Sequence, residues 1–266
     1  MRFMMLMIPL GYETAPPDVQ LDPERVAAMM RYNEALKDAG VLITLEGLHP
    51  PSMGARVSFA TGEPMVTDGP FTEAKEVLGG YWMIEVASRA EAIAWAKKCP
   101  ASPNEIIEIR QVQEIADYSP EVQEVVAGFG DLKKYSLTNQ PEEISMSTEH
   151  KFLAVYLGSM SGEKMKAWHA MPEAERKAKE REGMAAWHGW VEKHKDVIVE
   201  MGGPLGKTRR IDGRGITEIS NALTGFTVVR AASQEEAAKL FENHPHFAIF
   251  PGEAIEVMPV LPIPQM

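Results

Sequence analysis

The sequence has one cysteine among 266 residues, and its basic side chains are few: 27 Lys and Arg against 38 Asp and Glu. A single cysteine excludes a disulfide within the chain and is typical of a reducing compartment. The net charge of −11 argues against nucleic acid as a partner, because phosphate binding requires a clustered basic surface. No apolar run is long enough to cross a membrane. We therefore expect a cytoplasmic protein with neither a nucleic-acid nor a membrane partner.

What the sequence does contain is ordinary for a globular protein. Hydrophobic residues make up 45% and charged residues 24%, and the length suffices for two domains that each bury a core. The apolar start, MRFMMLMIPL, lacks a basic region followed by a small-residue cleavage site. We interpret it as a first β-strand and not as a signal peptide.

A stretch in the first half, residues 66–100, returns in part as residues 224–245. In each copy a serine followed three residues later by a glutamate predicts a helix start, and a proline predicts the helix end. The copies align without a gap over Gly80/Gly225, Ser88/Ser233, Glu91/Glu236 and Pro100/Pro245. The repeat indicates two similar units in one chain.

The order of predicted elements supports the same conclusion. In the first half we expect strands over 4–8, 41–45, 81–86 and 105–112, a hairpin over 56–67, and helices over 22–40 and 88–100. This order is that of a split-βαβ, ferredoxin-like unit. In the second half we expect strands over 152–157, 197–201, 226–229 and 254–261, and a helical region over 160–194 broken near Met171-Pro172.

These elements predict an α+β fold with a first domain over 1–115, a linker over 116–150 with a short helix at 119–126, and a second domain over 151–266. We expect the two domains to pack as a pseudo-dimer that buries the inner faces of strands 81–86 and 226–229. The turn Asp68-Gly69-Pro70-Phe71 lies where the first repeat is longer than the second. Any function of this turn is therefore expected in the first half alone.

The first half resembles the DGPF family of YCII-related proteins. The resemblance is carried by Asp68-Gly69-Pro70-Phe71 with TEAKEVLGGYWMIEV after it, by GVLITLEGLHPP upstream and by AKKCP downstream. The second half, with MAAWHGWVEKHKDVIVEMGGPLGK and GFTVVRAASQEEAAKLFENHP, looks like a more divergent YCII-related domain. The resemblance implies a ferredoxin-like fold of the dimeric α/β-barrel kind, bacterial origin and an association with sigma factors. It implies no established activity.

One proposal for simpler YCII domains is a histidine–aspartate pair, which neither half of this chain retains. At the position of the aspartate stand Cys99 and His244, and at the position of the histidine stand Tyr32 and His188. The acid–base chemistry of that pair is therefore not carried over.

Four residues are candidates for ligand binding: His49, Asp68, His188 and His244. Asp68 could be a pocket carboxylate, or it could cap its own turn through an Asx bond. His188 lies between two tryptophans, where it could line an aromatic pocket or pack with a hydrogen bond. His244 is expected between helix and sheet, where a buried histidine needs a partner. His49 precedes two prolines at a strand end.

The remaining patterns are not specific to one chemistry. The histidines lack metal-ligand spacing, and no phosphate-binding loop or nucleophile elbow is present; we expect no metal and no cofactor. The leading hypothesis is a protein that binds a small organic molecule in a cleft beside the paired sheets. The alternatives are an enzyme that uses Asp68, His49 or His188 for acid–base catalysis, and an interaction module linked to a sigma factor. A homo-oligomer is left open.

Overall fold

The computed structural model describes most of the chain, and its helices and strands follow the predicted order closely. The described residues are 1–17, 22–58, 63–70, 77–103, 105–117, 120, 123–124, 150–158 and 162–261. The elements of the first half are β1 (Arg2–Pro9), η1 (Tyr12–Thr14), α1 (Pro23–Asp38), β2 (Leu42–Leu48), η2 (Pro51–Met53), β3 (Ala55–Ser58), β4 (Met65–Asp68), β5 (Gly80–Glu85), α2 (Arg89–Ala96), β6 (Glu105–Val112) and η3 (Ile115–Asp117). The elements of the second half are β7 (His150–Gly158), α4 (Glu163–Ala170), α5 (Glu173–His194), β8 (Ile198–Asp212), β9 (Gly215–Ile219), β10 (Leu223–Ala231), α6 (Gln234–Lys239), α7 (Pro245–Ala248) and β11 (Gly252–Leu261). The predicted helix over 119–126 lies mostly outside the described residues.

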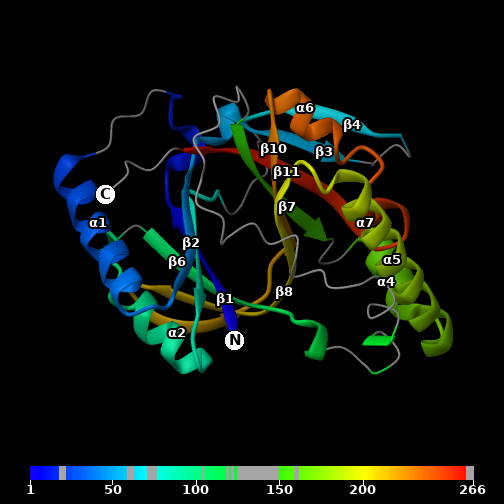
Figure 1. The fold of residues 1–266 in the computed structure, drawn as a ribbon, viewed down its shortest axis with the longest axis horizontal. Helices are drawn as coiled ribbons and strands as arrows, with labels where there is room; N and C mark the ends of the chain where they lie inside the picture. Colours follow the sequence, from blue (N-terminus) through cyan, green and yellow to red (C-terminus); the bar gives the residue numbers. More distant parts are fainter. Residues whose placement is uncertain are drawn as a thin grey trace.

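Eight of the described strands close into a barrel-like ring of a mixed α/β fold. The strand order is β2-β5-β1-β6 in the first half and β8-β10-β7-β11 in the second. Antiparallel pairing joins β6 to β8 and β11 to β2, so the last strand of each half meets the second strand of the other. We call these two contacts the β6–β8 seam and the β11–β2 seam. Helices α1 and α2 flank one side of the ring, and α5, α6 and α7 flank the other (Figure 1).

Each half also extends a hairpin onto the other half. The β3–β4 hairpin, predicted within residues 56–67, pairs with β11 of the second half. The second half has a hairpin that was not predicted, in which the end of β8 turns back as β9 while β8 pairs with β6 of the first half. The strand over 197–201 is therefore much longer than expected.

The two hairpins place one acidic residue each at matching strand positions. In the first hairpin Asp68 lies opposite Ala55, and Ala55 pairs with Val257. In the second hairpin Glu218 lies opposite Arg209, and Arg209 pairs with Ile109. Glu218 thus has the same place relative to its strands as Asp68. That any function of the Asp68 turn belongs to the first half alone stays a prediction.

Three clusters of buried apolar side chains make up the hydrophobic core. The cluster inside the ring draws on both halves, and it includes Met4, Leu6, Tyr81, Met83, Leu153, Val155, Phe226 and Val228. A second cluster lies between the first sheet and its helices, around Phe3, Trp82 and Leu36. The third lies between the second sheet and its helices, around Phe152, Trp190 and Phe241. The inner faces of the strands around Tyr81 and Phe226 are buried, as predicted.

Local signals set the helix starts. The side chains of Asp22, Ser88 and Ser233 each accept a hydrogen bond from a backbone N–H in the first helical turn, as the N-cap prediction requires. The helical region of the second half is broken at Met171-Pro172, also as predicted. Helix α2 ends at Ala96, earlier than the predicted end at Pro100.

Candidate functional site

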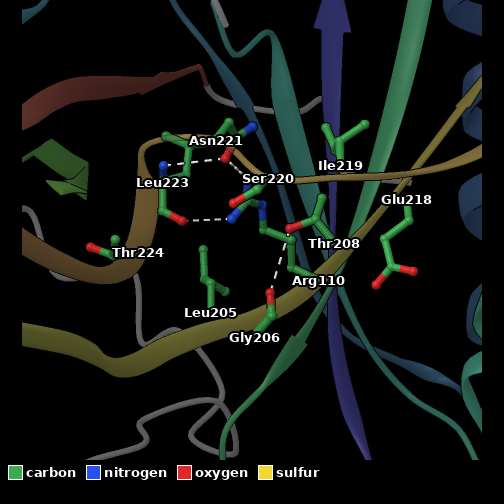
Figure 2. Close-up of a pocket in the computed structure, with 10 residues that line it drawn as sticks. All are labelled: Arg110, Leu205, Gly206, Thr208, Glu218, Ile219, Ser220, Asn221, Leu223 and Thr224. Atoms are coloured by element: carbon green, nitrogen blue, oxygen red, sulfur yellow. Dashed lines mark hydrogen bonds between the residues drawn. The ribbon is translucent and has the colours of Figure 1, made fainter. Parts of the chain in front are cut away.

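A cleft of about 620 Å³ lies at the β6–β8 seam, within the range of about 300–1,000 Å³ that is usual for small-molecule sites. It is enclosed by β6, the outer part of β8, β9 and the segment that leads into β10 (Figure 2). The lining residues are Arg110, Leu205, Gly206, Thr208, Glu218, Ile219, Ser220, Asn221, Leu223 and Thr224. The first half contributes Arg110 and the second half contributes the rest.

The long β8 strand is what creates this cleft. Because β8 continues past Pro204, Thr208 comes to lie directly opposite Arg110 on β6 and opposite Ile219 on β9. Residues opposite each other in antiparallel strands point to the same face, so these three side chains share one face. Leu205 and Leu223 belong to the cluster inside the ring and give the cleft an apolar part.

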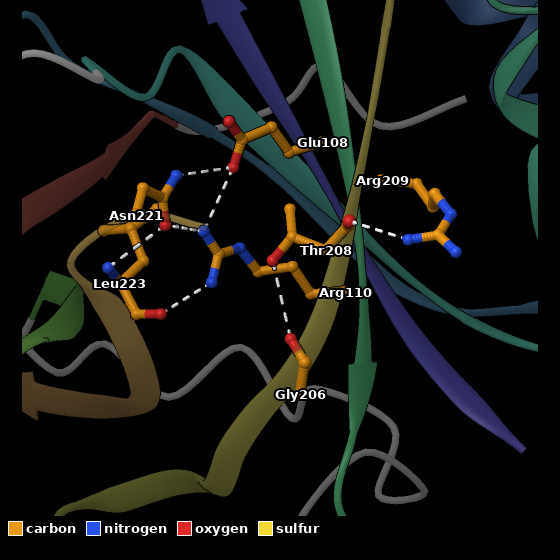
Figure 3. A network of polar contacts seen from close by, with 7 residues as sticks. All are labelled: Glu108, Arg110, Gly206, Thr208, Arg209, Asn221 and Leu223. Atoms are coloured by element: carbon orange, nitrogen blue, oxygen red, sulfur yellow. Dashed lines mark hydrogen bonds and ion pairs between the residues drawn. The ribbon is translucent and has the colours of Figure 1, made fainter. Parts of the chain in front are cut away.

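Arg110 carries the polar floor of the cleft, and its side chain is only 2% exposed. One of its terminal nitrogens, Nη1, donates a hydrogen bond to the carbonyl of Leu223 at 2.6 Å. The other, Nη2, donates to Oε2 of Glu108 at 3.1 Å and to the side-chain oxygen of Asn221. Asn221 Nδ2 donates to the same Glu108 oxygen at 2.9 Å. The three side chains and one carbonyl form a closed network (Figure 3).

The network holds a buried ion pair, since the Glu108 side chain is 1% exposed. Removing two charges from water is costly, and their attraction offsets this cost only when hydrogen bonds satisfy the remaining polar atoms. Leu223 and Asn221 supply such bonds to the terminal nitrogens of Arg110, whereas Glu108 Oε1 has no hydrogen-bond partner among the described residues. The positive charge at the floor of the cleft is therefore balanced within the protein, and the loop between β9 and β10 is fixed to β6.

The rim of the cleft is polar and more exposed. Arg209 and Glu218 form an ion pair at 2.9 Å, on the opposite face from Thr208 because neighbouring residues of a strand alternate. Thr208 is the exception: it is 4% exposed, and its hydroxyl donates to the carbonyl of Gly206 at 3.4 Å. Ser220 is exposed at the edge.

The four predicted site residues lie elsewhere, and none is among the ten described residues that line the cleft. His49 follows β2, its backbone N–H donates to the carbonyl of Pro259 at 3.1 Å, and partial burial lowers the pKa of its ring. Asp68 is the exposed last residue of β4. Gly69 after it donates its N–H to the carbonyl of Gly54 at 2.8 Å. Phe71 lies outside the described residues.

His188 and His244 are both buried among the helices of the second half. His188 is 3% exposed on α5, and burial lowers the pKa of its ring. His244 is fully buried at the N-cap of α7. Its Nδ1 accepts the backbone N–H of His246 at 3.2 Å, and its ring stacks on Tyr156 with centroids 5.0 Å apart.

The hydrogen bonds of His244 continue into the sheet. Since Nδ1 is an acceptor, Nε2 carries the proton and faces the Tyr156 hydroxyl at 3.5 Å. That hydroxyl lies 2.7 Å from Thr227 Oγ1, which donates to the carbonyl of Met201 at 3.0 Å. Burial, followed by the proximity of His246, lowers the pKa of His244 well below its usual value. The arrangement is that of a neutral histidine with structural partners.

Among the described residues, neither Cys99 nor the side chains of metal-ligating types form a further candidate site. Burial raises the pKa of the Cys99 thiol to about 12, which disfavours the reactive thiolate. Among the described residues there is no group of three or more His, Cys, Asp or Glu that could hold a metal ion. The helices that the structure describes include none that is long and apolar enough to span a membrane.

Sequence reasoning did not identify Arg110, Glu108 or Asn221. A signal was present in the strand EIIEIRQV. Glu108 and Arg110 lie on the same face of this strand as the apolar residues Ile106 and Val112. Two opposite charges on the buried face of a strand indicate an ion pair or a site. Asn221 had no comparable signal, since its role depends on a loop conformation.

The comparisons with known proteins give a family match for the first half. Residues 1–116 match the model of the YCII-related domain. An uncharacterized protein of Rhizobium meliloti (strain 1021) is 35% identical over 83 residues, which is 31% of this chain and 66% of that protein. The chain thus spans 66% of the length of this relative.

Solved structures that resemble the chain are distant in sequence. A point mutant of chlorite dismutase from Candidatus Nitrospira defluvii gives a TM-score of 0.40 and 8% identity, over 98% of this chain and 90% of that one. The same enzyme in complex with imidazole gives 0.41 and 7%, over 98% and 91%. Similarity at this level carries no argument about function.

Proposed function

We propose that this protein binds a small organic molecule in the cleft at the β6–β8 seam. The observation that carries the proposal is the hydrogen-bonded floor formed by Arg110, Glu108 and Asn221 beneath a cleft of about 620 Å³. A few fixed polar groups in a concave and partly apolar setting are typical of ligand sites. Because Arg110 is already bonded inside the protein, its position does not depend on the ligand.

The lining favours an uncharged ligand that has a polar and an apolar side. The charge of Arg110 is balanced by Glu108, so a charged ligand would find no unpaired opposite charge at the floor of the cleft. Thr208 and Asn221 offer hydrogen bonds, and Leu205 and Leu223 offer apolar contact. The ten described lining residues include no imidazole and no thiol, which favours binding over acid–base catalysis.

We further propose that residues 1–115 and 151–266 are two ferredoxin-like units packed as a pseudo-dimer and joined through residues 116–150. The equivalent strand orders and the reciprocal hairpins support this division. So do the charges where each hairpin pairs with the other half: Arg210 on β8 lies opposite Glu108 on β6, and Arg56 on β3 lies opposite Glu256 on β11. On this proposal the cleft depends on both units.

The test is a thermal-shift screen of small uncharged metabolites, since a ligand that binds the folded state raises the melting temperature by mass action. For each hit, the shift in melting temperature is then measured with the variant Ser220→Trp, which places a bulky ring at the cleft edge. The matched control is Thr217→Trp, at an exposed position of the same hairpin outside the lining. We expect the first variant to lose the shift and the control to retain it; equal shifts in both would refute the cleft as the site.

The same hits also test the sequence-predicted carboxylate. Asp68 lies on the β3–β4 hairpin, which pairs with β11 and not with β6 or β8. If the cleft is the site, Asp68→Asn keeps the shift. Loss of the shift in Asp68→Asn with retention in Ser220→Trp would move the site to the Asp-Gly-Pro turn.

A further inference from the structure

A second group of polar side chains lies inside the ring, away from the cleft. Its members come from five strands of both halves: Arg2, Glu46, Tyr81, Lys151 and Glu200. None of them is among the residues that line the cleft. We call these five residues the interior cluster.

The strand registers direct these side chains inward. Tyr81 belongs to the apolar cluster inside the ring, and Glu46 lies directly opposite it. Glu200 lies opposite Val228, which also belongs to that inner cluster. Opposite residues share a face, so Glu46 and Glu200 point to the interior as well. Lys151 Nζ meets Glu46 Oε1 at 3.2 Å.

Two members of the interior cluster are buried without a hydrogen-bond partner. Glu200 is 4% and Tyr81 2% exposed, yet no residue that the structure describes hydrogen-bonds the Glu200 carboxylate or the Tyr81 hydroxyl. Neither group is among the fully enclosed polar atoms that lack a partner, so each retains some accessible surface. Buried polar groups are almost always satisfied by protein, water or ligand.

The charges of the cluster leave one carboxylate unbalanced. Lys151 is paired with Glu46, and Arg2 forms its hydrogen-bonded ion pair with Glu114 at 2.6 Å. Arg2 favours the ionised form of Glu200, and Glu46 disfavours it. A carboxylate in this position is stabilised by a cation that can also donate hydrogen bonds.

We propose that the interior of the ring binds a small protonated amine, with its ammonium group donating to the Glu200 carboxylate and to the Tyr81 hydroxyl oxygen. An ammonium group has three donors, which suits two acceptors that lack protein partners. The inward-facing neighbours Met83 and Val228 are apolar, so the amine carries a short alkyl group and no second charge. This site is independent of the ligand proposed for the cleft.

The acidity of Glu200 adds a pH dependence to the proposal. Burial raises the pKa of Glu200 to about 7. The charge of Arg2 partly offsets this rise, and the charge of Glu46 adds to it. Lys151 and Arg2 are the cations, and Glu46 and Tyr81 the other titratable groups, that face it within the cluster. Because the amine binds the ionised carboxylate, its affinity falls about tenfold for each pH unit below that pKa.

The probe is n-propylamine, with n-propanol as the uncharged control of equal length. We follow the carboxyl carbon signal of Glu200 by NMR while each is added to the full chain. Propylamine is expected to shift this signal saturably at about pH 8 and roughly tenfold more weakly at about pH 6, with no saturable effect of propanol. Equal effects of the two probes would overturn the proposal, because they would reflect apolar binding alone.

Two variants separate the proposed contacts from general effects. Glu200→Gln keeps the shape and removes the charge, and should abolish propylamine binding measured by calorimetry. Glu253→Gln, at an exposed glutamate on β11, is the matched control and should bind as the parent does. Tyr81→Phe should weaken binding several-fold and keep the pH dependence. Parent-like affinity in Glu200→Gln, with a parent-like circular dichroism spectrum, would exclude Glu200 as the acceptor.

Discussion

Replacing Glu200 by Gln should stabilise the protein at neutral and alkaline pH and have little effect near pH 4. The amide has nearly the shape of the carboxyl group but cannot ionise. In the folded protein burial raises the pKa of Glu200 from 4.5 to about 7. Between these two values the unfolded chain ionises at this position while the folded protein stays protonated. The parent therefore loses stability as the pH rises through this window, and the variant does not.

The size of the effect follows from the pKa difference. One pKa unit corresponds to about 1.4 kcal/mol, so a pKa raised from 4.5 to about 7 gives about 3 kcal/mol over the whole window. The sign is fixed by proton counting: the folded state binds more protons than the unfolded state, so stability falls with rising pH. The free energy of unfolding of Glu200→Gln minus that of the parent should thus increase by about 3 kcal/mol from about pH 4 to about pH 8.

Urea unfolding at several pH values measures this difference directly. Comparing variant and parent removes contributions from other groups, notably His246, whose pKa burial lowers to about 4 and whose effect therefore has the opposite slope. In the variant the upward slope from His246 and from the other histidines with lowered pKa values, His188 and His244, should no longer be opposed by Glu200, so stability should rise from about pH 4 to about pH 6.5. A difference between the two proteins that does not change with pH would refute the reasoning, because Glu200 would then titrate normally.

Two further predictions concern the cleft and the backbone of β8. Replacing Arg110 by Met should lower the free energy of unfolding by about 3–5 kcal/mol, measured by urea unfolding, because Glu108 would remain as a buried uncompensated charge. Adding Glu108→Leu should recover most of this loss. If the double variant recovers nothing, the loss is not a charge effect. Gly202 has a φ of +68°, and a Cβ there would lie 1.9 Å from the carbonyl oxygen of Phe226, so Gly202→Ala should cost at least about 2 kcal/mol. Gly213→Ala, where a Cβ meets nothing within 4 Å, is the control, and an equal loss in both would refute the steric argument.

The parts of the fold that depend on local signals could be predicted from the sequence. The serine N-caps at Ser88 and Ser233 and the break at Met171-Pro172 are set by neighbouring residues, and they appear where expected. The continuation of β8 was missed because Gly202-Gly203-Pro204 has the composition of a strand end. In the structure Gly202 takes a positive φ where the register with β10 shifts, which carries the strand past the irregularity.

The candidate site was harder to predict because its residues are brought together by pairing between the halves. Arg110 and Thr208 are far apart in sequence and become neighbours only through the β6–β8 register. Hydrophobic periodicity shows which face of a strand is buried but not which strand lies beside it. The histidines attracted attention by their chemistry, whereas the polar floor of the cleft is built from an arginine, a glutamate and an asparagine.

The reciprocal hairpins have a consequence for how the chain could be divided. Each half contributes strands that the other needs on both flanks, so a half made alone would expose two unsatisfied sheet edges and tend to aggregate. If the gene is divided at a point between codons 117 and 150 and the two fragments are expressed together, their sheet edges are complementary. They should assemble into a single particle, and neither should be recovered in useful amounts without its counterpart.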